Sequence, residues 1–150
     1  TQTLNPASTG FMITGNAYGD YFGNWANTAG GLSKDGYDDI IIGAFRKNNN
    51  QGAAYVIYGG EKALMKNIAL STQTLDPLTT GFVVTGNAAN NNFGNCVGPA
   101  GDFNKDGFSD IIVTAYAKGA AYLITPGILF LFARHFFNLY SSMHNILQSM

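Results

Sequence analysis

The chain repeats its own sequence, and this duplication limits the folds that are open to it. The first copy begins at Thr1 and the second at Thr72, an offset of 71 residues that is lost only near the end. The matching pairs are TQTLNPASTGFMITGNA (1–17) with TQTLDPLTTGFVVTGNA (72–88), KDGYDDIIIGA (34–44) with KDGFSDIIVTA (105–115), and, after a deletion of four residues, QGAAYVIYG (51–59) with KGAAYLITP (118–126). Tandem copies of this kind are typical of architectures in which similar units stack on one another.

Each copy predicts several short strands separated by loops rich in Gly, Asn and Asp. The β-branched runs Ile40–Ile42 and Ile111–Val113 are typical of buried strands. We expect strands at 11–14, near 25–29, at 40–44 and at 53–58, and in the second copy at 82–85, 96–100, 111–115 and 120–124. Four short strands in each copy, arranged radially, make the blade of a β-propeller. The prediction is an all-β fold with two four-stranded blades, which is a partial propeller.

The motifs of both copies resemble the FG-GAP repeat, the unit of the propeller in integrin α-subunits. Phe22-Gly23 and Phe93-Gly94 match its first element, and Gly43-Ala44-Phe45 approximates the Gly-Ala-Pro element with Phe in place of Pro. Thr114-Ala115-Tyr116 keeps only the Ala. The resemblance implies a blade at 1–71, a second blade with a calcium loop at 72–124, and a non-repeat tail at 125–150.

The resemblance also implies a location outside the cell or on its surface and a role in adhesion or protein recognition. Propellers close with about four to eight blades, so a chain with two blades is expected to associate with further blades or with copies of itself. Two alternatives stay open: an accessory domain of a secreted or surface hydrolase, and a truncated fragment without a function of its own. No signal peptide is expected, because no basic stretch followed by an apolar run opens the chain.

Residues 102–110, DFNKDGFSD, combine oxygen-bearing side chains with a glycine. Acceptors at the first, third, fifth and ninth positions can surround one Ca²⁺ if the chain turns sharply after the fifth. The proposed ligands are Asp102, Asn104, Asp106, Asp110 and the backbone carbonyl of Phe108. The EF-hand is excluded, because its twelfth position needs Glu and is Val113 here. The alternative is an Asx-rich turn without a metal.

The same loop in the first copy has lost part of this set. The position of Asp102 is Gly31 and that of Asn104 is Ser33, while Asp35 and Asp39 are retained and Tyr37 supplies the equivalent carbonyl. We therefore expect Ser33, Asp35, Tyr37 and Asp39 to form at most a weak, degenerate metal loop. A polar turn is the favoured interpretation there.

The remaining composition argues against catalysis and against nucleic acid. Charged residues make up 11% of the chain and its net charge is −1, so no basic surface is available to neutralise phosphates. Both histidines, His135 and His144, lie in the tail, and no nucleophile motif accompanies them. The sequence thus predicts a non-enzymatic protein.

The tail itself, 125–150, shows apolar residues at helical spacing after Pro126. We expect a short helix that packs on protein. Contact with a membrane surface is less favoured, because the segment carries little positive charge.

Overall fold

The computed structural model describes residues 4–6, 9–61 and 66–127. The helix predicted at 125–150 therefore lies almost entirely outside the described residues. Nine strands are present in that part of the chain: β1 (Ile13–Thr14), β2 (Phe22–Gly30), β3 (Asp39–Ala44), β4 (Ala53–Ile57), β5 (Ile68–Ala69), β6 (Gly81–Thr85), β7 (Phe93–Gly101), β8 (Asp110–Ala115) and β9 (Ala120–Ile124). Single turns of 3-10 helix (η1, Tyr18–Asp20; η3, Tyr116–Lys118) and a short turn, α1 (Lys47–Asn50), connect some of them.

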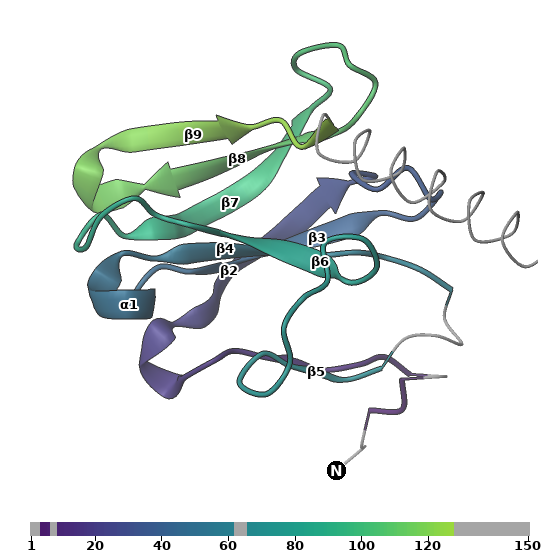
Figure 1. Ribbon diagram of the computed structural model, residues 1–150, viewed down its shortest axis with the longest axis horizontal. Coiled ribbons are helices and arrows are strands. Elements are labelled where there is room, and N and C mark those ends of the chain that lie inside the picture. The colour runs from purple at the N-terminus through teal and green to yellow at the C-terminus, as the bar shows by residue number, and fades with distance from the viewer. Residues whose placement is uncertain (1–3, 7–8, 62–65, 128–150) are drawn as a thin grey trace, which may run out of the picture.

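Seven of these strands form two antiparallel sheets that pack face to face (Figure 1), and β1 and β5 form a short parallel pair. The first sheet has the order β2-β3-β4-β6 and the second the order β7-β8-β9. The predicted all-β class and partial propeller are confirmed. Both sheets carry a bulge at the same place, between Phe22 and Ala26 and between Phe93 and Val97, so the duplication is preserved in backbone detail.

The prediction that each copy builds its own four-stranded blade is wrong in one respect. β6 belongs to the second copy by sequence, yet it pairs antiparallel with β4, from Ala53 opposite Thr85 to Ile57 opposite Gly81. Without β6, the outer edge of β4 would leave its backbone N–H and C=O groups unpaired. Among the described residues, the second sheet has only three strands, and β9 has no partner on its outer edge.

The strand predicted at 11–14 corresponds to β6 at the repeat offset, but within the described residues it does not add to a four-stranded sheet as β6 does. Its residues Ile13–Thr14 pair in parallel with β5 instead, and the N–H of Leu70 donates to the carbonyl of Thr14 (3.0 Å). This β1–β5 segment covers part of the first sheet's outer face, where Leu70 is buried against a cluster that includes Ala44, Ala53 and Tyr55.

The main core lies between the two sheets. Ile41 and Val56 of the first sheet and Ile111 and Val113 of the second are fully buried in one cluster. A neighbouring residue in β3 and in β8 points to the opposite face of its sheet. The exposed fraction is 36% for Ile40 and 40% for Ile112. The run Ile111–Val113 is therefore buried mainly on the face between the blades, whereas in the first run Ile42, on the same side as Ile40, is only 6% exposed and is buried on the outer face as well.

The Phe-Gly motif of the second repeat makes a close backbone contact between the sheets. A Cβ on Gly94 would collide with the carbonyl oxygen of Ala53, and one on Gly43 would collide with the carbonyl oxygen of Gly94. The N–H of Phe93 also donates to the carbonyl of Gln51 (3.2 Å). Glycine is thus required on both sides of this junction.

Candidate functional site

The loop between β7 and β8, together with the first residue of β8, contains the five residues predicted to bind calcium in the second repeat. Gly107 has a φ of +84° and Lys105 a φ of +59°, and these left-handed residues turn the chain sharply in the middle of the loop. Their counterparts in the first repeat, Gly36 and Lys34, have φ values of +95° and +54°. The two loops therefore share one backbone course.

Asp110 anchors the loop through hydrogen bonds to its backbone. It is fully buried, and its Oδ2 accepts the N–H groups of Phe103 (2.8 Å) and Asn104 (3.3 Å). Its other oxygen, Oδ1, is buried and has no hydrogen-bond partner in the described part of the chain. An unpaired buried carboxylate oxygen is unfavourable, and it requires an explanation.

The other three acceptors lie nearer the surface and make hydrogen bonds within the loop. Oδ2 of Asp102 accepts the N–H of Gly107 (3.0 Å), and Oδ1 of Asn104 accepts the N–H of Asp106 (3.0 Å). Oδ1 of Asp106 accepts the N–H of Phe108 (2.9 Å), and its Oδ2 accepts Nδ2 of Asn104 (2.9 Å). The loop as it stands is an Asx-rich turn that brings the predicted side chains together on one short segment.

These hydrogen bonds favour the ionised form of Asp106. The N–H of Phe108 contributes most to lowering the pKa of this carboxyl, followed by the side chain of Asn104, and the charge of Lys34 adds to the effect. No three His, Cys, Asp or Glu side chains within the described ranges converge as a metal-binding group. The acidic side chains would therefore have to give up some of their bonds within the loop to surround an ion.

Phe108, the proposed carbonyl ligand, is fixed by its side chain. The ring is 4% exposed and belongs to the core between the sheets, whereas Tyr37 at the same position of the first loop is 41% exposed. The two loops are also in contact with each other, because the ammonium of Lys34 lies 3.8 Å from the centre of the Phe108 ring. Sequence analysis did not reveal this contact, since it depends on how the blades pack.

The loop of the first repeat keeps the turn and lacks two of the acceptors. Oδ1 of Asp35 accepts the N–H of Tyr37 (2.9 Å), as Asp106 does for Phe108. Asp39 is fully buried, and its Oδ2 accepts the N–H groups of Leu32 (2.8 Å) and Ser33 (3.1 Å). Both of its oxygens are in use, because Oδ1 accepts the N–H of Gly59 (2.9 Å).

Burial raises the pKa of Asp39 above its ordinary value, although its three backbone donors oppose the effect. Asp35 and Tyr37 lie on the same turn, and Ser33 contributes a buried hydroxyl without a partner among the described residues. The interpretation of this loop as a structural turn thus rests on hydrogen bonds that occupy its buried carboxylate completely.

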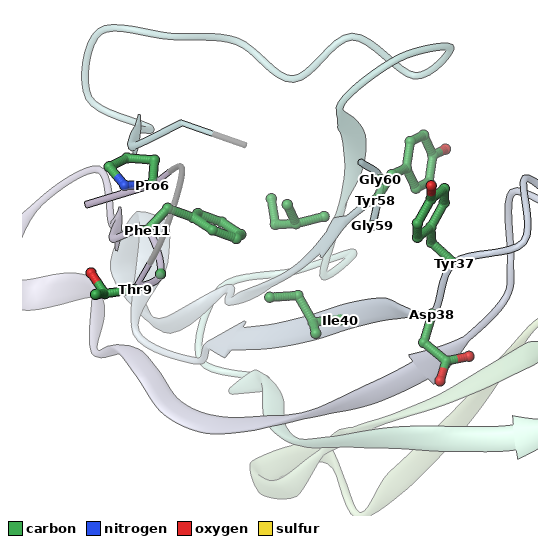
Figure 2. A pocket seen from close by; sticks show the side chains of 11 residues that line it. Pro6, Thr9, Phe11, Tyr37, Asp38, Ile40, Tyr58, Gly59 and Gly60 are labelled. Atoms are coloured by element: carbon green, nitrogen blue, oxygen red, sulfur yellow. The ribbon is translucent and has the colours of Figure 1, made fainter. Parts of the chain in front are cut away.

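A cleft of about 450 Å³ lies on the outer face of the first sheet (Figure 2). Its walls are mainly apolar and include Phe11, Ile40 and Ile57, with Asp38 at one side. Tyr58 also borders the cleft, and its hydroxyl donates to the carbonyl of Pro77 (2.9 Å). No nucleophile paired with a general base lines this cleft within the described residues.

Comparison with known proteins agrees with the fold. The FG-GAP repeat family matches residues 97–124, which include the whole second loop. Integrin alpha pat-2 of Caenorhabditis elegans is 36% identical over 110 residues, and that of Caenorhabditis briggsae is also 36% identical over 110 residues. This chain belongs to the FG-GAP repeat family. Its fold is that of an integrin-alpha-like propeller fragment.

The FG-GAP chain corresponds to a small part of these relatives. The matches cover 72% of the chain but 8% of either integrin alpha. Phosphatidylinositol-glycan-specific phospholipase D of Bos taurus is 32% identical over 112 residues, and the chain covers 13% of it. Within the described ranges, no helix has the length and apolar character needed to span a membrane.

Proposed function

We propose that the FG-GAP chain is a calcium-binding, non-enzymatic portion of an integrin-alpha-like propeller that recognises a protein partner outside the cell. The observation that carries the calcium part is Oδ1 of Asp110, a buried carboxylate oxygen without a partner in the described part of the chain. It lies at the base of a loop that also presents Asp102, Asn104 and Asp106. Oxygen ligands of this kind suit Ca²⁺ better than zinc or copper.

The proposed ligands are the side chains of Asp102, Asn104, Asp106 and Asp110 with the backbone carbonyl of Phe108. The buried oxygen of Asp110 fits this role, because a cation would compensate an acceptor that no N–H group of the described residues reaches. Asp102 and Asp106, nearer the surface, need only replace their hydrogen bonds from N–H groups of the same loop by contacts with the ion. The ion would supply a structural clamp between β7 and β8.

The proposed partners are further blades of the same kind or copies of this chain. Ile112 and Leu123 are each 40% exposed on the outer face of the second sheet, while their counterparts Ile41 and Val56 are fully buried between the sheets. Among the described residues, the outer edge of β9 also lacks the partner strand that β6 gives to β4. An additional repeat would cover this face and this edge in the way the second repeat covers the first.

A location on the cell surface or outside the cell, and a role in adhesion, are supported by the similarity to integrin alpha chains. The similarity to phosphatidylinositol-glycan-specific phospholipase D supports a second candidate, an accessory propeller domain beside a hydrolase. Sequencing the gene on both sides separates the two candidates. Further blades on both sides favour the integrin-like protein, and an adjoining catalytic domain favours the hydrolase.

Isothermal titration calorimetry with CaCl₂ tests the calcium site. Asp106→Ala and Asp35→Ala remove the equivalent Asx-turn bond, to Phe108 and to Tyr37 respectively, and Asp106→Ala also removes the bond from Nδ2 of Asn104. We expect one Ca²⁺ per chain with a dissociation constant in the range of about 10⁻⁴–10⁻³ M. Binding should be lost in Asp106→Ala and kept in Asp35→Ala. No binding to the unsubstituted chain, or equal loss in both variants, contradicts the proposal.

A further inference from the structure

The two loops differ at one buried carboxylate oxygen. Asp39 and Asp110 are both fully buried, and each accepts two N–H groups of its own loop on Oδ2. Oδ1 of Asp39 additionally accepts the N–H of Gly59 (2.9 Å). Oδ1 of Asp110 is buried without any such donor among the described residues.

The missing donor corresponds to a proline. Pro126 takes the position of Gly59 when QGAAYVIYG (51–59) is aligned with KGAAYLITP (118–126). The strand registers agree, because Ile57 pairs with Ile40 next to Asp39, and Ile124 pairs with Ile111 next to Asp110. Proline has no backbone N–H. The group that satisfies Asp39 is therefore absent from the second repeat.

The chain after β9 lies directly against the second loop. Gly127 is buried, and a Cβ placed on it would collide with the carboxylate of Asp106. In the first repeat, a Cβ on Gly59 would collide with the carbonyl oxygen of Asp38. In both repeats, then, the segment that follows β4 or β9 packs on the loop that precedes the buried aspartate.

We propose that Pro126 determines which of the two loops takes a divalent cation, by leaving Oδ1 of Asp110 without a backbone donor. This inference rests on the proposed calcium site at 102–110. A buried acceptor without a donor favours a cation that can approach it. In the first repeat, the N–H of Gly59 competes for the equivalent oxygen, so Asp39 only stabilises the turn. Pro126 is a positioning residue in this scheme and contacts no ion itself.

Pro126→Ala tests the inference, because it restores the N–H and keeps a Cβ of similar size. Pro77→Ala is the control. It also removes a proline, but from a different turn, near the start of the second repeat, which Asp76 stabilises. Calcium titration calorimetry and melting in EGTA are measured for both variants and for the unsubstituted chain. Pro126→Gly, which reproduces Gly59, repeats the test if the alanine variant does not fold.

With Pro126→Ala we expect the calcium dissociation constant to rise about tenfold or more, because the new N–H competes with the ion for a buried oxygen. The melting temperature in EGTA should rise by about 2–6 °C, because the same oxygen gains a donor. Pro77→Ala should leave the calcium affinity unchanged. An unchanged dissociation constant in both Pro126 variants overturns the role of Pro126 alone. Absence of calcium binding by the unsubstituted chain overturns the calcium site as well, so the two failures are distinguishable.

Discussion

Asp39 is a buried side chain that stabilises the turn of the first repeat. It is fully buried and accepts three backbone N–H groups, from Leu32, Ser33 and Gly59. Removing such an acceptor leaves all three donors unpaired in the interior. We expect Asp39→Ala to lower the free energy of unfolding by about 2–4 kcal/mol. The neighbouring Asp38→Ala, at an exposed position, should change it by less than about 0.5 kcal/mol in the same urea titration.

The pKa shift of Asp39 determines the direction in which its contribution to stability changes with pH. Its pKa in the folded chain is raised above the unfolded value of 3.8, chiefly by burial. The folded chain therefore binds this proton more tightly than the unfolded chain, and the contribution of Asp39 to stability falls as the pH rises from about 3.8 to the folded pKa. An NMR titration of the Asp39 carboxyl carbon measures this directly. A folded pKa below 3.8 would mean that its three N–H donors outweigh burial.

At the scale of the elements, the Phe-Gly motif allows the backbones of the two blades to come into direct contact. Gly23 and Gly94 have nearly the same φ, +85° and +83°, so replacement by Ala strains both backbones alike. Only Gly94 faces a neighbour: its added Cβ would collide with the carbonyl of Ala53, whereas Gly23 has nothing within 4 Å. We expect Gly23→Ala to cost about 1 kcal/mol and Gly94→Ala about 3 kcal/mol or more.

Urea unfolding of the two glycine variants, followed by the fluorescence of Trp25, gives the comparison. The difference between them isolates the contact between the sheets from the strain of a left-handed residue. Equal losses of stability would show that Phe93-Gly94 does not hold the second blade on the first.

The elements themselves follow from the sequence better than their partners do. Strands β3, β4, β8 and β9 lie where apolar runs between Gly- and Asp-rich loops predict them. Their sheet membership does not follow from local preference: the repeat pattern predicts residues 82–85 in the second blade, whereas β6 pairs with β4 of the first. The same limit applies to the site. The acceptors at 102–110 are visible as a motif, but the unequal environments of Asp39 and Asp110 depend on the strand register that brings Gly59 to the first of them.

At the scale of the molecule, two blades leave apolar surface that a closed propeller would bury. The outer face of the second sheet exposes Ile112 and Leu123. We expect the isolated chain to associate as its concentration rises, because this face repeats the one that is buried between the sheets. Ile112→Lys should weaken association in sedimentation velocity and leave the fold intact. Ile41→Lys, at the equivalent buried position, should unfold the chain.

An association that is unchanged by Ile112→Lys would show that this face is not the one that self-associates. A chain that sediments as a monomer at all concentrations would contradict the expectation of further blades or copies as partners.

The most direct test of the account is thermal unfolding followed by circular dichroism, in EGTA and in millimolar CaCl₂. If the loop at 102–110 binds Ca²⁺ with a dissociation constant near 10⁻⁴ M, millimolar calcium should stabilise the fold by about 1.4 kcal/mol and raise the melting temperature by several degrees. The rise should persist in Asp35→Ala and disappear in Asp106→Ala. A cooperative transition that calcium does not shift would leave residues 102–110 as a polar turn and contradict the proposed function.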